Sequence, residues 1–270
     1  MTVNDHALVI AAHGSHRNPD SSKSTFFHAN TIRDETTIAE VRETFWKEEP
    51  SFREILRILH SRNVVVVPLF MSEGYFVAEI LPRELRLTDR EPLDVDKDVT
   101  ITPPVGTHSL LRTVIEHRAT SIIDEKTALS EVALAVIGHG TERNEQSAAS
   151  TRSHVNELRQ SGRFSDVAAF FLDEAPYVAD IYSTFSATDI VVVPLFVADG
   201  YHTTTDIPQA LGIESSARTT SDGPARVNGR RIWYAGAVGT DPRMVDVILE
   251  RANEAGLPFR RDRQTGGDSR

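Results

Sequence analysis

The sequence contains one pattern twice, and this duplication restricts the chain to folds made of two similar halves. The apolar run that ends at Ala12-His13-Gly14-Ser15 returns as the run that ends at Gly138-His139-Gly140-Thr141, 126 positions later. A constant offset indicates two copies of one unit with little insertion or deletion. The same offset relates Val64–Phe70 to Ile190–Phe196, Ser21 to Ser147, Thr25 to Thr151, His28 to His154, Glu48 to Glu174 and Pro50 to Pro176.

The length of the chain fits two domains of ordinary size. It has 270 residues, and domains of about 100–150 residues are the commonest. We therefore expect an N-terminal repeat over residues 1–125 and a C-terminal repeat over residues 126–258. Residues 259–270 are polar and contain glycine, and we expect them to form a disordered tail.

The composition excludes several classes of site and partner. The chain has no cysteine, so disulfides, thiolate metal ligands and cysteine nucleophiles are excluded. Its net charge of -10 argues against nucleic acid as a partner, because phosphate binding requires a positive field. The polar N-terminus has no secretory pattern, and no apolar stretch is long enough to span a membrane. We expect a cytoplasmic protein without a membrane partner.

Strand-like and helix-like segments alternate along both copies. Continuous apolar runs such as Leu8–Ala12 and Val132–Ile137 are typical of strands buried on both faces. Segments with helical character lie between such runs, for example residues 50–61 and 147–161. The alternation predicts an α/β fold in which each half is a small doubly wound parallel sheet of about four strands.

The two copies differ in length near their ends. A stretch rich in Gly, Ser, Thr and Arg over residues 212–230 is expected to be a loop that leads into a strand at Ile232–Val238. Beyond it the offset becomes 133, because Val105-Gly106-Thr107 corresponds to Val238-Gly239-Thr240.

Three polar side chains follow three strands of the second copy. His139, Glu174 and His202 each lie just beyond a predicted strand, and ligands of parallel sheets bind beyond the carboxyl ends of the strands. We therefore expect the three to converge on one crevice. Two imidazoles and a carboxylate suit a borderline divalent ion such as Co, Ni, Fe or Zn, and an open site leaves positions for substrate or water. The imidazoles could also accept protons from a substrate.

Each of these residues also has a structural interpretation. A histidine between a strand and a glycine can cap a loop, and Glu174 can face a helix N-terminus. The pair Asp173-Glu174 can be solvated charge, although Glu174 keeps register with Glu48. The matched His28 and His154 lie within predicted helices, where a role on the helix face is favoured over a functional one.

The combination of motifs resembles a known family. Both copies have a strand followed by His-Gly-Ser or His-Gly-Thr and a strand that ends in Val-Val-Pro-Leu-Phe, and the second has Gly200-Tyr201-His202-x-x-x-Asp206-Ile207-Pro208. These elements are similar to the sirohydrochlorin chelatases of the CbiX type, within the ATP-independent tetrapyrrole chelatases. The resemblance covers nearly the whole chain. It implies the long, duplicated form, with two doubly wound sheets that face each other across a cleft.

The resemblance also implies which residues act. Its catalytic and metal-binding positions fall on His139, His202 and Glu174. The first copy keeps His13 but has Phe76 where the second histidine should be, and Ile80 where Asp206 is. We therefore expect a single active site in the C-terminal half. The carboxylates of the substrate need basic partners, for which arginine geometry is suited, and the expected substrate-binding residues are His13, Arg17, Arg143 and Arg152.

The implied function is a sirohydrochlorin cobaltochelatase, which inserts Co2+ with loss of pyrrole protons on the way to cobalamin. The metal is then a substrate, and no permanently bound cofactor is expected. Insertion of Fe2+ for sirohaem, or of Ni2+, is an alternative, because metal selection in the cell depends on supply. A non-catalytic carrier of metal or tetrapyrrole is an alternative of another class. A monomer is expected because the two halves supply both lobes.

Overall fold

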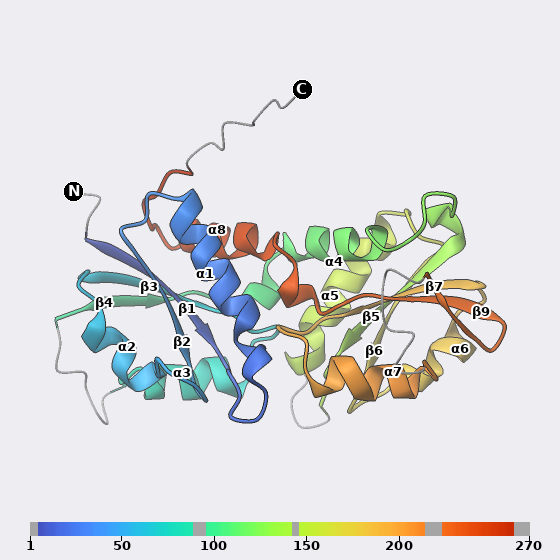
Figure 1. Cartoon of the computed structure of the whole chain (residues 1–270), viewed down its shortest axis with the longest axis horizontal. Coiled ribbons are helices and arrows are strands. Elements are labelled where there is room, and N and C mark those ends of the chain that lie inside the picture. The colour runs from blue at the N-terminus through green and yellow to red at the C-terminus, as the bar shows by residue number, and fades with distance from the viewer. Residues whose placement is uncertain (1–4, 89–95, 142–145, 214–222, 262–270) are drawn as a thin grey trace. The chain divides into compact units, whose positions relative to one another are not determined.

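A computed structural model of the chain describes residues 5–88, 96–141, 146–213 and 223–261. The described residues form two compact units, each built around one β-sheet (Figure 1). Helices cover both faces of each sheet, as expected when strands and helices alternate. The prediction of two doubly wound α/β units is confirmed.

The first sheet has four parallel strands in the order β2-β1-β3-β4. The apolar run Ala7–Ala12 forms most of β1, which pairs with β2 on one side and β3 on the other. Because β1 is central, the winding direction reverses after β2, and this reversal places helices on both faces. The strands are β1 His6–Ala12, β2 Glu40–Phe45, β3 Asn63–Pro68 and β4 Asp98–Ile101.

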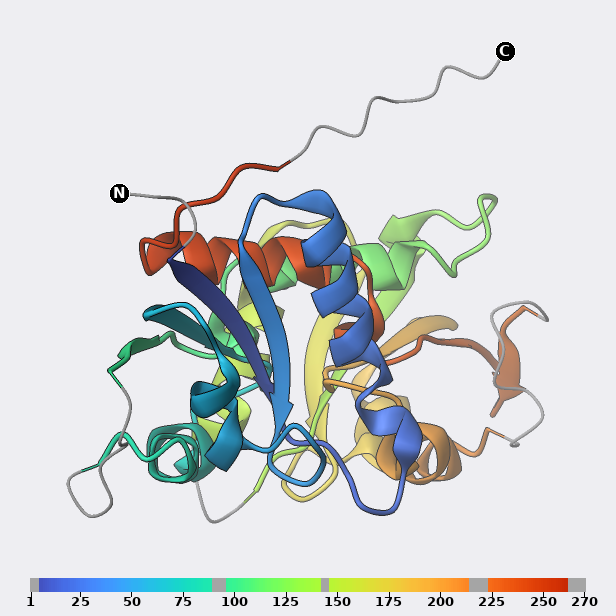
Figure 2. The same ribbon diagram turned by 60° about the vertical axis from the view of Figure 1, so that its left-hand side comes forward.

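Helices of the first repeat pack apolar side chains onto this sheet. Phe52 and Ile55 of α2 and Leu81 of α3 are buried against β1 and β3, while α1 lies on the opposite face (Figure 2). The helical segments are η1 Pro19–Ser21, α1 Lys23–Glu35, α2 Phe52–Ile58, the π-helical η2 Phe76–Ile80, α3 Leu81–Glu84, η3 Val105–Thr107 and α4 Leu111–Thr120.

The second sheet repeats this topology and adds one strand, in the order β6-β5-β7-β9-β8. Its strands are β5 Val132–Gly138, β6 Asp166–Phe171, β7 Asp189–Pro194, β8 Ala225–Val227 and β9 Arg230–Tyr234. The segment β8 is antiparallel to β9 and lies within residues 212–230, which we predicted to be a loop. That prediction is wrong for the hairpin, whose turn is Asn228-Gly229 with positive φ at both residues. Asn-Gly is a strong hairpin signal that the sequence analysis did not use.

Helices of the second repeat cover the second sheet in the same way. Ile181 of α6 and Ile207 of α7 are buried against β5 and β7, and α5 packs on β5 and β6. The helical segments are η4 Leu129–Glu131, α5 Gln146–Gln160, η5 Val178–Asp180, α6 Ile181–Thr184, the π-helical η6 His202–Asp206, α7 Ile207–Ala210, η8 Val238–Thr240 and α8 Met244–Glu254.

The last helix of each repeat packs in the unit of the other repeat. Residues 245–254 of α8 belong to the first unit, and α4 belongs to the second. Two arginines at corresponding positions mark this exchange. A guanidinium N–H of Arg118 on α4 donates to the carbonyl of Ala237 at 2.9 Å, and one of Arg251 on α8 donates to the carbonyl of Pro104 at 3.2 Å. The offset of 133 relates both donors and both acceptors, so the exchange is reciprocal.

The compact units therefore do not follow the predicted boundary at residues 125 and 126. The first contains described residues of Met1–Leu69, Tyr75–Val105 and Val245–Arg270, and the second contains Phe70–Gly74 and those of Gly106–Met244. Corresponding helices of the two repeats carry similar apolar faces, so the sequence pattern alone does not determine which sheet each one covers.

The first residues of the predicted disordered tail are ordered. The backbone of Arg260 exchanges two hydrogen bonds with Thr37, each 2.9 Å long, and Arg261 forms a β-bridge with Thr36. The prediction is therefore wrong at residues 259–261, where the chain pairs with the segment between α1 and β2. The rest of the predicted tail, residues 262–270, lies outside the described residues.

Candidate metal-binding site

His139 lies in the loop that follows the fully buried strand β5. Its side chain is 49% exposed at the carboxyl edge of the sheet. The next residue, Gly140, has φ +71, and a Cβ there would lie 2.7 Å from Cγ of Glu174. Because only glycine fits this conformation and this space, the chain turns sharply after His139 and leaves its ring at the surface.

His202 begins the π-helical turn η6 that follows β7. Such turns are rare and are frequent at functional sites. Nδ1 of His202 lies 2.7 Å from Oδ2 of Asp206, the last residue of the turn. The hydroxyl of Tyr234 on β9 donates to the carbonyl of Thr203 at 2.6 Å, so the sheet itself holds the turn in place.

The structure brings the two predicted histidines together. The ring centroids of His139 and His202 are 5.1 Å apart, and their planes cross at 85°. An imidazole that binds an ion through Nε2 at ~2.1 Å has its ring centre ~3.2 Å from the ion. Centres 5.1 Å apart then correspond to an angle of roughly 105° at the ion, close to tetrahedral. The spacing therefore suits one ion bound by both rings.

An acceptor faces the Nδ1 atom of each ring. Nδ1 of His139 is 2.9 Å from the carbonyl of Gly140 and 3.4 Å from Oδ2 of Asp173, and Asp206 is the acceptor for His202. Carbonyl and carboxylate oxygens only accept, so Nδ1 carries the proton and the neutral ring has its lone pair on Nε2. This arrangement is typical of metal-binding histidines, whose second nitrogen is held by a carboxylate or carbonyl.

The two aspartates were not among the predicted site residues. From the sequence, Asp173 has an interpretation as solvated charge, and Asp206 is part of the Gly-Tyr-His motif. A signal was present, because the first repeat has Lys47 and Ile80 at the corresponding positions. These carboxylates are therefore absent from the repeat that lacks the second histidine.

Glu174 supports the histidine loop. Its Oε2 accepts the N–H of Thr141 at 3.0 Å, and its Oε1 accepts from Arg152 at 2.7 Å. Glu48 in the first repeat accepts the N–H of Ser15 at 2.6 Å in the same way. No group of three or more His, Asp or Glu side chains able to hold a metal occurs among the described residues. The predicted catalytic and metal-binding role of Glu174 stays a prediction.

The predicted substrate-binding arginines lie in different settings. The Arg152 guanidinium contacts Glu174 and lies 5.1 Å from the centre of the Phe171 ring. Arg17 is exposed in the loop after β1, where its backbone N–H donates to Oγ of Ser15. Arg143 lies outside the described residues. The substrate-binding roles of these arginines stay predictions.

His13, the fourth predicted substrate-binding residue, lies in an aromatic cluster of the first repeat. Its ring centroid is 5.0 Å from that of Trp46 and 5.6 Å from that of Phe76. Nδ1 of His13 lies 2.8 Å from the carbonyl of Gly14, as in the His139 loop. The loop is therefore retained in the first repeat, while a second imidazole is replaced by an aromatic ring.

His154 has the structural role that was favoured from the sequence. It is 3% exposed on α5, and its Nε2 lies 2.8 Å from the carbonyl of Gly106. A Cβ at Gly106 would lie 2.2 Å from the backbone of Met71, so this turn packs directly on another backbone segment. His154 holds the tight contact in place, and burial lowers its pKa from the usual value.

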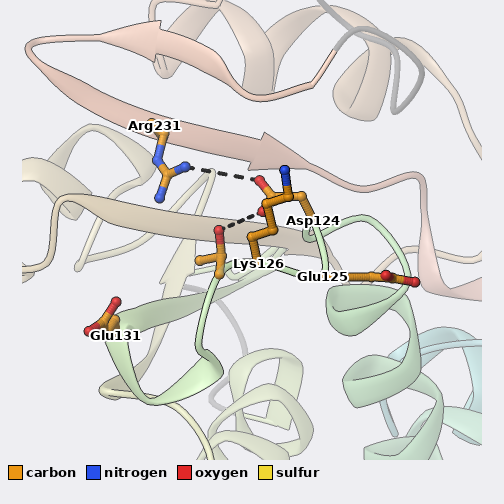
Figure 3. Close-up of a pocket in the computed structure, with 6 residues that line it drawn as sticks. Asp124, Glu125, Lys126, Glu131 and Arg231 are labelled. Carbon is orange, nitrogen blue, oxygen red and sulfur yellow. Dashed lines mark hydrogen bonds and ion pairs between the residues drawn. The ribbon is translucent and has the colours of Figure 1, made fainter.

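A cavity of about 660 Å³ lies at the amino edge of the second sheet, opposite the edge that carries His139 and His202. It is lined by Asp124, Glu125, Lys126, Thr127, Glu131 and Arg231 (Figure 3). These residues lie at or before the amino ends of β5 and β9. Both guanidinium contacts of Arg231 to Asp189 measure 2.6 Å, and this pairing raises the pKa of Arg231. Ligands of parallel sheets bind at the carboxyl edge, so this cavity is separate from the histidine site.

Comparison with protein families identifies the chain. The CbiX family model matches residues 7–122 and again residues 133–255. The chain belongs to the CbiX family. The two matched segments coincide with the two sequence repeats, so this member of the CbiX family is the duplicated form that the motifs indicated.

Named relatives agree with this assignment. A protein of Halobacterium salinarum, described as a probable sirohydrochlorin cobaltochelatase, is 50% identical over 93% of this chain and 92% of its own length. A sirohydrochlorin cobaltochelatase of Methanopyrus kandleri is 32% identical over 46% of this chain and 96% of its own length. The second relative therefore corresponds in length to about one repeat of this CbiX chain.

Solved structures show the same fold. A multi-domain protein of Deinococcus radiodurans with structural similarity to chelatases matches with a TM-score of 0.78 and 27% identity, over 96% of this chain and 57% of that one. The CbiX of denitrifying bacteria matches with a TM-score of 0.67 and 22% identity, over 93% of this chain and 100% of that one. Within the described part of this CbiX chain, no helix has the length and apolar character to cross a bilayer.

Proposed function

We propose that the chain is a sirohydrochlorin cobaltochelatase, which inserts Co2+ into sirohydrochlorin and acts as a monomer. The observation that carries this proposal is the pair His139 and His202, whose rings lie 5.1 Å apart with Nδ1 of each facing an acceptor. The relative that is 50% identical and is described as a probable sirohydrochlorin cobaltochelatase supports the substrate and the metal.

The two imidazoles would hold the ion through Nε2 before it enters the macrocycle. Two protein ligands leave the other coordination positions open to water and to the pyrrole nitrogens of the substrate. Neutral imidazole suits cobalt, nickel, iron and zinc alike, so the protein ligands bind the metal without fixing its identity. Phe196, whose ring centroid is 6.2 Å from each imidazole, gives the site an apolar wall that limits access of solvent.

Metal insertion also requires a proton acceptor, because the pyrrole N–H protons leave as the ion enters. We assign this role to one of the two histidines: once the ion leaves its Nε2 for the pyrrole nitrogens, that lone pair is free to accept one pyrrole proton, and the second proton passes to water. Asp173 and Asp206 then balance the positive charge at the rings. Glu174 is proposed to contribute by holding the loop that carries His139, and its carboxylate adds negative charge beside the ion.

Substrate carboxylates would pair with arginine side chains near the loops. Arg17, Arg143 and Arg152 remain our candidates, together with His13. Arginine matches the planar geometry of a carboxylate and stays charged. In a chain of net charge -10, such local basic groups are needed for a polyanionic substrate to bind.

The proposal is tested by anaerobic insertion of Co2+, Fe2+ and Ni2+ into sirohydrochlorin, followed by absorbance. We expect insertion of Co2+ well above the rate without protein, and loss of this catalysis in the His139→Ala/His202→Ala double variant. Arg53→Ala is a matched control, because Arg53 lies on α2 of the first repeat and pairs with Glu84. Binding of metal or macrocycle without any increase in insertion rate would instead support a carrier.

A further inference from the structure

The first repeat has a distinct set of side chains where the second has its metal site. At the positions of Leu172, Asp173 and His202 the first repeat has Trp46, Lys47 and Phe76. The leucine, carboxylate and imidazole of the second repeat are thus replaced by an aromatic ring, a cation and a second aromatic ring. Loss of metal binding alone would not require an aromatic residue at two positions and a charge of opposite sign at the third.

The three rings form one connected group, which we call the aromatic cluster: His13, Trp46 and Phe76. The centroid of Trp46 is 5.0 Å from those of His13 and Phe76, and His13 is 5.6 Å from Phe76. These distances lie within the range of about 4.5–7 Å preferred by aromatic pairs. The buried ring of Phe52 lies 6.3 Å from Phe76 and fixes the cluster to the core of the first unit.

The cluster lies where parallel sheets bind ligands. His13 follows β1, Trp46 follows β2, and Phe76 begins the π-helical turn after β3, so all three are at the carboxyl edge. His13 is exposed, and Trp46 and Phe76 are only partly buried. Tyr75, which precedes Phe76, is 66% exposed. Part of the aromatic surface at this edge is therefore accessible to solvent.

A cation accompanies these rings. The Lys47 ammonium lies 3.6 Å from the centre of the Trp46 ring. Lys47 is one of only four lysines in a chain of net charge -10. The cation–π contact holds the ammonium beside the aromatic surface. The ring planes cross at 78° for His13 and Trp46 and at 67° for Trp46 and Phe76, and the ammonium lies over the Trp46 ring. This surface of aromatic faces and edges with a cation complements a conjugated ligand that carries carboxylates.

We propose that the aromatic cluster and Lys47 form a binding surface of the first unit for the conjugated ring system and one carboxylate of a polycarboxylate tetrapyrrole. This inference rests on the proposed function for the class of ligand. It assigns Trp46, Lys47 and Phe76 to ligand binding, and it makes the first repeat a binding module although it lacks the paired histidines.

Tryptophan fluorescence can test the proposal, because the chain has two tryptophans. Trp233 is 3% exposed on β9, and Trp233→Phe leaves Trp46 as the only emitter. Cobalt-loaded sirohydrochlorin serves as the probe, since it undergoes no further insertion. We expect saturable quenching of Trp46, and Lys47→Asp in the same background should weaken the measured affinity by about tenfold, as attraction becomes repulsion.

Lys126→Asp is the matched control, because it changes the net charge equally at the amino edge of the second sheet. Its affinity should stay within about twofold of the parent. Phe76→Leu, which keeps an apolar side chain, should weaken binding without lowering the melting temperature by more than a few degrees. Equal affinity in the Lys47→Asp and Lys126→Asp variants, or absence of saturable quenching, would overturn the proposal. Insertion activity of the wild-type chain is measured separately, so failure of this surface and failure of the chelatase function give different results.

Discussion

The loops after β1 and β5 have the same frame and different chemistry. In both, a histidine precedes a glycine of positive φ, and a glutamate from the next loop accepts the N–H of Ser15 or Thr141. In the second a partner histidine lies 5.1 Å away, whereas the first has Phe76 at the corresponding position. Positions shared by the repeats therefore build the loop, and positions that differ determine what the loop can bind.

The largest expected effect concerns the histidines. His202→Ala and His139→Ala each remove a metal ligand, so we expect insertion of Co2+ to fall by at least about 100-fold, the upper range for loss of a supporting residue. His13→Ala should keep insertion within about tenfold of wild type, because Phe76 stands where its partner histidine would be. Initial rates under anaerobic conditions measure both. If His13→Ala were as inactive as His202→Ala, the contrast between the two loops would be wrong.

The aspartates should follow with an intermediate effect. Asp206→Asn and Asp173→Asn remove the carboxylates that orient the two rings, for which losses of about 10–100-fold are usual. We expect the greater loss for Asp206, whose oxygen is 2.7 Å from its imidazole, than for Asp173 at 3.4 Å. Rates at varied metal concentration separate a raised KM for Co2+ from a lowered kcat. Wild-type values in both variants would show that the rings are oriented by other groups.

Glu174 and Glu48 provide a comparison between matched residues. Glu174→Gln should lower turnover by about tenfold, because the loop that carries His139 must be held within a fraction of an ångström. Glu48→Gln makes the same change in the first repeat and should leave turnover nearly unchanged. Thermal melting is the control, with similar small shifts expected for both. Wild-type turnover in Glu174→Gln would leave this carboxylate without a role in insertion.

The smallest expected effect concerns His154, a buried histidine that both repeats have at corresponding positions. Burial lowers the pKa of His154 below 6.5, despite the nearby Glu157 carboxylate and with added repulsion from Arg112 and His108. The unfolded chain therefore binds more protons below pH 6.5, and stability falls as pH decreases from there toward the folded-state pKa. His154→Gln should reduce the stability difference between pH 7.5 and 5.5, by no more than about 1.4 kcal/mol for a group that titrates at about 6.5 when unfolded. Denaturant unfolding at the two pH values measures it, and an unchanged difference would contradict the buried, neutral state.

Much of the fold could be predicted from the sequence because buried parallel strands are continuous apolar runs. The repeat located both sheets, and the carboxyl-edge rule placed His139 and His202 on one site. The helix exchange could not be predicted, because α4 and α8 carry equivalent apolar faces and either sheet satisfies them. The hairpin of β8 and β9 differs from the predicted loop because Asn228-Gly229 turns the chain back on itself with positive φ at both residues.

The limits of site prediction have a similar physical origin. Agreement between the repeats drew attention to Glu174 and His154, which the structure shows holding backbone in place. Asp173 and Asp206 were missed because their importance comes from distances to Nδ1 atoms that spacing in sequence does not give. Both aspartates are at positions where the two repeats differ, with Lys47 and Ile80 in the first repeat. A comparison of the positions that differ between the repeats would have indicated them.

The exchange of α4 and α8 has a consequence for any attempt to divide this chain. A fragment that ends at residue 125 contains β1 to β4 and α4, but not α8, which covers the first sheet with α1. In the arrangement of the intact chain, its sheet would keep a bare apolar strip and its last helix would lack the sheet that it normally covers. Because either sheet satisfies α4, two such fragments could satisfy each other by trading helices, as in a domain-swapped dimer. The intact chain is thus a swapped pair joined by a covalent link, and its halves are expected to fold as partners rather than as independent pieces.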